Sequence, residues 1–201
     1  MTTTTDGRRA RGDISRETVM RLAVDIASVD GLEGLSIGTL AMGANLSKSG
    51  VVALFGNKEK LQLAAIEAAR EIFIASVISP ALKLQGGRER LEGLLENWIR
   101  YSEGRIFAGG CFFAAATAEV ASKHGPVRDA VADQLAKWDD TISRVIIRAV
   151  DKGELARPDD VGQLAFEIRS VLDGANTDSL IFGSAAPYDR ARTALKRLLS
   201  R

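Results

Sequence analysis

The chain has 201 residues, of which 46% are hydrophobic and 26% charged, and its 27 Lys and Arg residues against 26 Asp and Glu residues give a formal net charge of +1. This composition excludes a wholly disordered chain, a collagen-like fibre and a strongly basic nucleic-acid coat. Cys111 and His124 are the only residues of their types, so the sequence excludes an internal disulfide and a structural zinc site built from Cys and His.

The sequence shows no membrane or secretion segment. No apolar run reaches the roughly 18 residues that a membrane-spanning helix requires. The first 16 residues carry charge but lack the apolar core of a secretion signal. We therefore expect a soluble, cytoplasmic protein without a membrane partner.

The first part of the chain predicts an arm followed by helices. Residues 1–13 are polar and basic, and we interpret them as a flexible arm. From Arg16 onward, apolar residues recur at helical spacing up to Gly31, a residue type that commonly ends helices. Ser36 and Ser47 are candidate N-caps of two short helices. The predicted helices run over 16–31, 37–43 and 48–55, and from 58 to about 79.

The second part also predicts helices. Pro80 and Gly86-Gly87 mark a break in the helical pattern. Beyond this break, we expect helices over 91–99, 112–121, 126–153, 160–182 and 188–199. No alternating apolar pattern is sustained, so we expect no β-strands and an all-α fold.

A helix followed by two short helices with a tight Gly43-Ala44-Asn45 turn is the layout of a helix-turn-helix motif. The second short helix would be the recognition helix, whose start needs small or polar residues so that its backbone can approach DNA phosphates and base edges. The sequence Ser47-Lys48-Ser49-Gly50 meets this requirement.

Residues 35–64, LSIGTLAMGANLSKSGVVALFGNKEKLQLA, resemble the DNA-binding domain of the tetracycline-repressor (TetR) family, and the resemblance is strong over about 16–65. Its most specific part runs from Ser47 through Phe55 to Leu61. The resemblance implies that Phe55 closes the recognition helix and that the Lys58 amine lies near the phosphate backbone. One departure is that Val52 and its two successors donate no hydrogen bonds, where the family often has aromatic or His residues.

A weaker resemblance extends into the rest of the chain, over 109–113, 125–129, 164–167 and 174–176. It matches a C-terminal subgroup in which two long late helices form a dimer interface. The implied organisation is a basic arm (1–13), a helix-turn-helix DNA-binding domain (14–58) and a helical-bundle domain for ligand binding and dimerisation (59–201). We expect a homodimer through the helices near 127–151 and 160–182, because each carries a long apolar face.

The resemblance implies a transcriptional regulator, and we expect a homodimeric repressor released from a palindromic double-stranded operator by a small apolar effector. Residues 1–60 carry eight Lys and Arg against seven Asp and Glu, so the placement of charge must matter more than its sum. The basic arm could enter a minor groove or remain a solvated tail. The predicted DNA contacts are Arg8, Arg9, Thr39, Ser47, Lys48, Ser49, Gly50, Val52 and Lys58.

Large aromatic residues of the C-terminal half are candidates to line the effector pocket as a group, although core packing is the favoured interpretation for any single one of them. The predicted pocket residues are Trp98, Tyr101, Phe107, Phe112, Phe113, Trp138 and Asn176. Asp173 and Asn176 could serve a ligand site or a subunit seam. Cys111 could be a redox sensor, but a small buried hydrophobe is the favoured interpretation.

No nucleotide-binding glycine loop or zinc-protease motif occurs, so we expect no enzyme, cofactor or metal. The alternative interpretation is an all-α ligand-binding or enzymatic protein that has lost DNA binding. The apolar Val52, Ala53 and Leu54, together with the near-neutral N-terminal part, keep this alternative open.

Overall fold

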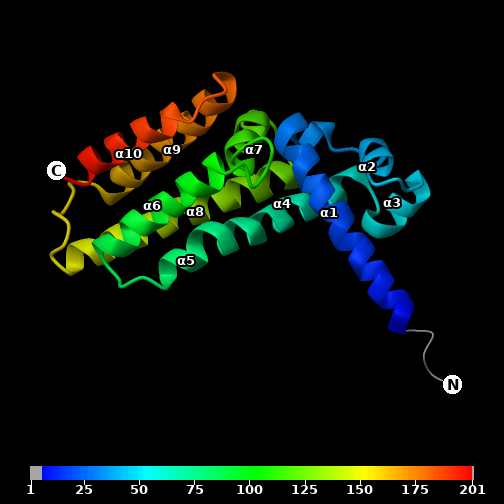
Figure 1. The fold of residues 1–201 in the computed structure, drawn as a ribbon, viewed down its shortest axis with the longest axis horizontal. Coiled ribbons are helices and arrows are strands. Elements are labelled where there is room, and N and C mark those ends of the chain that lie inside the picture. Colours follow the sequence, from blue (N-terminus) through cyan, green and yellow to red (C-terminus); the bar gives the residue numbers. More distant parts are fainter. Residues whose placement is uncertain (1–5, 201) are drawn as a thin grey trace.

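The computed structural model describes residues 6–200, with side chains from residue 16 onward, and every regular element in this part is helical (Figure 1). The predicted all-α fold class is therefore confirmed. None of the helices between residues 6 and 200 is both long and apolar enough to cross a membrane. The elements are α1 (Asp6–Gly34), α2 (Ile37–Gly43), α3 (Lys48–Phe55), α4 (Lys58–Phe73), a π-helical turn η1 (Ile74–Ile78), α5 (Ser79–Leu82), α6 (Arg88–Glu103), α7 (Phe112–Val120), α8 (Pro126–Asp151), α9 (Val161–Ile181) and α10 (Ala186–Leu198).

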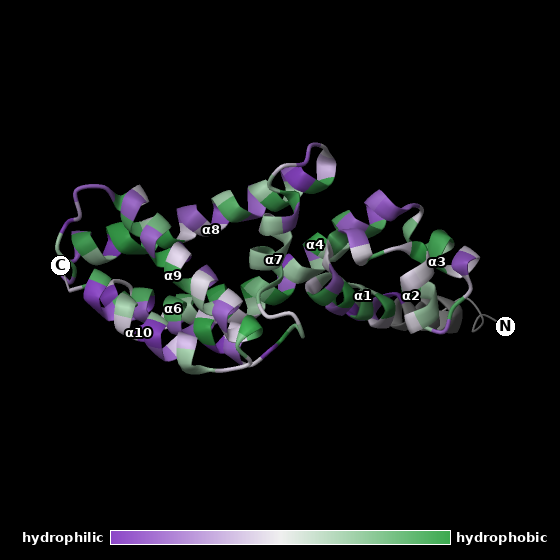
Figure 2. Cartoon of the chain, turned by 90° about the horizontal axis from the view of Figure 1, so that it is seen from above, coloured by the Kyte–Doolittle hydropathy of each residue, from purple (hydrophilic) through white to green (hydrophobic). Residues whose placement is uncertain are grey.

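The molecule is elongated, with α1–α3 at one end and α6, α8, α9 and α10 at the other (Figures 1 and 2). We call α1–α3 the head and the elements from α4 onward the body. Two helices connect these parts: α4 packs against α1 and α3 as well as α8, and α7 packs against both α1 and α8. Both polar and apolar residues occur along the helices, as amphipathic packing requires (Figure 2).

Side-chain caps fix the starts of the short helices. Ser36 Oγ accepts from Thr39 N at 3.1 Å, and Thr39 Oγ1 accepts from Ser36 N at 2.9 Å, which together form a capping box. Ser47 Oγ accepts from Gly50 N at 3.1 Å and caps α3. Both predicted caps are confirmed. Asn57, which was not among the predicted caps, caps α4 by accepting from Lys60 N at 2.8 Å.

Helix α1 differs from expectation at its start. It begins at Asp6, whereas the sequence predicted a flexible arm up to residue 13. The Arg-Arg-Ala-Arg run has high helix propensity, which explains how the helix extends backwards despite two glycines. Residues 1–5 and the side chains of Arg8 and Arg9 lie outside the described part of the structure.

The helical path of α1 breaks at Gly31, where the sequence predicted an end. Gly31 has φ +76°, a left-handed conformation that glycine adopts without strain, and a short helical turn then restarts at Leu32. This break turns the chain toward α2.

An aromatic cluster joins the helices of the body. The Phe73 ring packs edge-on against Tyr101, Phe113 and Trp138, with centroids 5.5, 6.0 and 5.1 Å away. Edge-to-face pairs of this kind are favourable beyond the area that they bury. Directly after Phe73 the helix widens into η1, whose Val77 carbonyl accepts a hydrogen bond from Asn97 Nδ2 at 3.2 Å. The cluster therefore fixes α4, α6, α7 and α8 around one point.

Candidate functional site

The head exposes the start of α3. Ser47, Lys48 and Ser49 are exposed, while Val51 and Phe55 of the same helix are buried at 0% and 6% exposure. The buried side chains attach α3 to the head, so its N-terminal turn faces solvent. This arrangement has the geometry that a recognition helix requires.

Not every predicted DNA contact has a free polar group. Thr39 is exposed on α2, but its hydroxyl bonds to Gly34 O at 3.0 Å and takes part in the α2 cap. The Ser47 hydroxyl caps α3 and lies 3.0 Å from Ser49 Oγ. Val52 is 46% exposed and can offer only apolar contact. Lys48 and the backbone near Gly50 thus lie at the exposed start of the helix.

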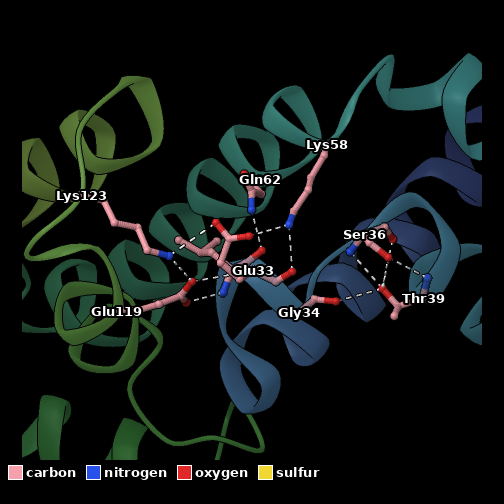
Figure 3. A network of polar contacts seen from close by, with 9 residues as sticks. Glu33, Gly34, Ser36, Thr39, Lys58, Gln62, Glu119 and Lys123 are labelled. Carbon is pink, nitrogen blue, oxygen red and sulfur yellow. Dashed lines mark hydrogen bonds and ion pairs between the residues drawn. The ribbon is translucent and has the colours of Figure 1, made fainter.

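Lys58 lies at the start of α4 but is engaged within the chain. Its Nζ donates to Glu33 Oε2 at 2.6 Å and to Glu33 O at 3.0 Å (Figure 3). The hydrogen bond from Lys58 and its charge, together with Lys123, lower the pKa of Glu33. The Lys58 side chain is 42% exposed, so an approaching phosphate could compete with Glu33 for this amine.

A cavity of about 350 Å³ lies in the body between α4, α6, α7, α8 and α9. Its aromatic lining comes from four helices: Phe73 from α4, Trp98 from α6, Phe113 from α7 and Trp138 from α8. An apolar interior with a few polar groups is typical of small-molecule sites between helices.

Of the predicted pocket residues, Trp98, Phe113 and Trp138 line this cavity. The others do not: Tyr101, Phe107 and Phe112 are buried at 1–2% exposure in the core beside it. Tyr101 packs against Phe107 at 5.8 Å, and Phe107 against Phe112 at 6.0 Å. These three rings therefore pack in the core, as the alternative interpretation allowed, and do not line the cavity.

Asn176 also lies outside the cavity lining. Its Oδ1 accepts hydrogen bonds from Ser102 Oγ at 2.8 Å and from Cys111 N at 2.9 Å. Ser102 Oγ also lies 2.8 Å from Tyr188 Oη, which is 2.9 Å from Ser179 Oγ. Asn176 therefore belongs to a buried network that ties α9 to α6, α10 and the start of α7.

Arg169 and Asp173 of α9 also line the cavity; the sequence pattern left Asp173 between a ligand site and a subunit seam and did not indicate Arg169. Arg169 Nε donates to Asp139 Oδ1 at 2.8 Å, and its Nη1 lies 3.5 Å from Asp173 Oδ2. Burial raises the pKa of Asp173 to about 6, against the opposing effect of Arg169. The carboxyl is therefore close to its titration range at neutral pH.

Cys111 lines the same cavity and is buried, with 2% of its surface exposed. Burial raises the pKa of its thiol to about 12, so the thiol stays protonated at neutral pH. Because the thiolate is the reactive form, this environment fits the buried-hydrophobe interpretation and not the redox sensor.

Three further cations line the cavity. Arg70 pairs with Glu67, Lys137 with Asp133 at 2.6 Å and Arg144 with Asp140, in each case within one helical turn. The helical periodicity of the sequence did not predict that these three residues line the cavity. Their charges are partly balanced by these acids, which leaves the aromatic surface as the main feature of the cavity.

Large apolar side chains remain exposed on the two long late helices. Ile147 of α8 is 45% exposed, and α9 with its C-cap exposes a further group of apolar side chains. This group consists of Phe166, Leu180, Ile181 and Phe182. Leu180, Ile181 and Phe182 are consecutive in sequence, and exposed apolar patches mark interaction surfaces in soluble proteins.

Comparison with known proteins gives concordant matches. The family model described as "Tetracyclin repressor-like, C-terminal domain" matches residues 87–195. A TetR transcriptional regulator from Chloroflexus aurantiacus is 26% identical, with a TM-score of 0.83 over 96% of this chain and 97% of that one. A TetR-family regulator from Cytophaga hutchinsonii is 21% identical, with a TM-score of 0.82 over 94% and 95%.

A further similar structure is that of AibR in complex with isovaleryl coenzyme A and operator DNA. It is 21% identical, with a TM-score of 0.67 over 81% of this chain and 86% of that one. None of the curated proteins matches the chain in sequence.

Proposed function

Since the chain belongs to the tetracycline-repressor (TetR) family of transcriptional regulators, we propose that it is a homodimeric repressor that a small, largely apolar effector releases from a pseudo-palindromic operator. One observation carries this proposal: an exposed polar recognition-helix start and an aromatic cavity are connected through α4. Lys58 begins α4, and Phe73, its last residue, lines the cavity.

The DNA contacts come from the start of α3. Lys48 and Ser49 reach base edges or phosphates, the backbone near Gly50 approaches closely, and Thr39 and Val52 supply van der Waals contact. Lys58 exchanges Glu33 for a phosphate oxygen when DNA binds. Arg8 and Arg9 add phosphate or minor-groove contacts from the start of α1.

The effector occupies the cavity of the body. The rings of Trp98, Phe113 and Trp138 accept an apolar or aromatic ligand, and Arg169 with Asp173 supplies the polar contacts that orient it. The AibR structure, which holds isovaleryl coenzyme A and operator DNA, supports the view that this fold accommodates both kinds of ligand. Release from DNA requires that the effector bind one head arrangement more tightly than the other.

The dimer forms through α8 and α9. The exposed apolar side chains of these helices, Ile147 and Phe166 among them, support this interface. A two-fold axis there would place the two α3 helices in successive major grooves, about 34 Å apart. Sedimentation at micromolar concentration should therefore show a dimer, and a monomer would contradict this part of the proposal.

The proposal is tested by titrating the purified protein against the DNA that flanks its own gene, with scrambled DNA as control, at two salt concentrations. We expect saturable binding in the nanomolar range to the flanking fragment, weakening as salt rises because counterions are released. Absence of binding at low salt would favour the alternative, an all-α ligand-binding protein that has lost DNA binding. The apolar Val52–Leu54 stretch is the feature that favours this alternative.

A further inference from the structure

The body caps a helix of the head. After the break at Gly31, the amides of Leu32 and Glu33 start a new helical turn and lack partners within it. The Glu119 carboxylate of α7 accepts both, from Leu32 N at 2.6 Å to Oε2 and from Glu33 N at 2.9 Å to Oε1 (Figure 3). Charge-assisted bonds to paired backbone amides are among the stronger hydrogen bonds in proteins.

The local backbone is suited to this contact. A Cβ atom at Gly31 would lie only 2.5 Å from Glu119 Oε2. Glycine at this position therefore allows both the positive φ and the close approach of the Glu119 carboxylate to the backbone. On the other side, buried Gln62 of α4 donates through Nε2 to Leu32 O at 2.6 Å. We call Gly31–Glu33 the joint: α7 holds its amides and α4 holds its carbonyl.

Charged side chains connect the Glu119 contact to the start of α4. Lys123 lies 3.3 Å from Glu119 Oε1 and 3.4 Å from Glu33 Oε1, and Glu33 in turn holds Lys58 (Figure 3). The pairs of Glu33 with Lys58 and Lys123 are exposed, so each contributes little stability by itself. The two amide bonds of Glu119 are the directional part of the arrangement.

The capping helix is also a wall of the cavity. Phe113, Ala114 and Thr117 of α7 line the cavity, and Glu119 follows two residues later. The loop before α7 is fixed to the same helix of the head, since Gly109 N donates to Ser28 Oγ at 3.1 Å. A side chain at Gly109 would overlap the Ser28 carbonyl, so this approach is tight.

We propose that Glu119 is the positioning residue that fixes the head on the body, and that occupancy of the cavity reaches the head through it. A ligand that displaces α7 would move this carboxylate away from the joint and release the head orientation on which half-site spacing depends. The consequence for DNA affinity rests on the proposed function, whereas the coupling between the cavity and the joint does not.

Amide hydrogen exchange at Leu32 and Glu33 tests the capping directly. Glu119→Ala should raise both exchange rates at least tenfold, because both acceptors are lost. Lys123→Met, which removes an ion pair and keeps the acceptors, should leave the rates unchanged. Glu92→Gln is the matched control, since Glu92 pairs with Arg88 of the same helix, α6, at 2.7 Å. Unchanged exchange in Glu119→Ala would overturn the proposal.

A cavity-filling substitution serves as the probe for coupling. Ala114→Trp should change the amide exchange rates of Leu32 and Glu33 at least threefold, although residue 114 lies in the cavity lining and not in the joint. Thr117→Met replaces Ala114→Trp if the tryptophan variant does not fold. The same substitution in the Glu119→Ala background should have no further effect at these amides. Equal effects in both backgrounds, or no effect in either, would overturn the coupling.

DNA binding by the same variants separates this inference from the proposed function. If the wild type binds the flanking fragment, the cavity-filling substitution should change that affinity at least fivefold, and only when Glu119 is present. Equal changes in both backgrounds would overturn the route through Glu119. If the wild type binds no DNA, the repressor function fails, and the exchange experiment still decides whether Glu119 couples cavity and joint.

Discussion

The head and the body use polar side chains over different ranges of sequence. In the head, Ser36 and Ser47 each bond to a backbone amide three residues away. In the body, Ser102 Oγ bonds to Asn176 and Tyr188, which are 74 and 86 residues away. Helices α2 and α3 of the head are therefore short and locally capped, whereas the body depends on contacts among distant helices. Substitutions should act locally in the first and globally in the second.

The largest effect should come from the buried network of the body. Asn176→Ala leaves the buried Cys111 N–H without its acceptor and removes a partner of Ser102, so we expect a loss of about 3 kcal/mol of unfolding free energy. Chemical denaturation measures this loss. Thr193→Ala removes a hydroxyl that donates to Asp189 O, one turn earlier in the same helix, at 3.0 Å, and should cost far less. Similar losses in both variants would mean that the long-range network of the body contributes no more to stability than a local hydroxyl bond.

A smaller effect, on binding and not on stability, is expected at the surface of the head. Lys48→Ala should weaken operator binding by about 1.4 kcal/mol, or tenfold, while unfolding stays within experimental error because the side chain is exposed. Lys58→Ala should weaken binding to all sequences and lower the salt slope by about one. Lys83→Ala, at an exposed site in the body, is the control. Unchanged affinity in both Lys48→Ala and Lys58→Ala would invalidate the proposed register of the recognition helix.

A cap in the head should contribute about 1 kcal/mol. Ser36→Ala removes the acceptor of Thr39 N and disrupts the capping box of α2. Thermal or chemical unfolding should register this loss, which is smaller than that of Asn176→Ala. Ser49→Ala is a suitable comparison, since its hydroxyl bonds to Ser47 Oγ and caps no helix. A loss as large as that of Asn176→Ala would show that the head is not locally organised.

The same contrast explains what the sequence could predict. The bounds of α2 and α3 and their caps follow from residues three positions apart, and Gly31 ends a helix for a reason contained in its own backbone. The cavity depends on how helices cross, which no periodicity specifies. Phe112 and Phe113 are neighbours in sequence, yet only Phe113 lines the cavity. For the same reason, the contact of Glu119 with the joint has no signal in the sequence.

The smallest predicted effect concerns pH and the cavity. The folded-state pKa of Asp173, about 6, lies above its ordinary value of 3.8 because burial disfavours the carboxylate. Between these values the folded protein binds more protons than the unfolded chain, so this residue lowers stability as pH rises from about 4 to 6. Asp173→Asn should therefore stabilise the protein at pH 7 and have little effect at pH 4. The gain should stay under about 1 kcal/mol, because the side chain is still 36% exposed and screened by water, and Arg169 opposes the shift. Arg169 keeps Asp139 as a partner at 2.8 Å in this variant, so its own pairing is not lost.

Unfolding curves at both pH values would measure the difference, with Asp178→Asn, exposed on the same helix, as control. Destabilisation at pH 7 would mean that the Asp173 carboxylate is held by its pairing with Arg169 more strongly than burial disfavours it.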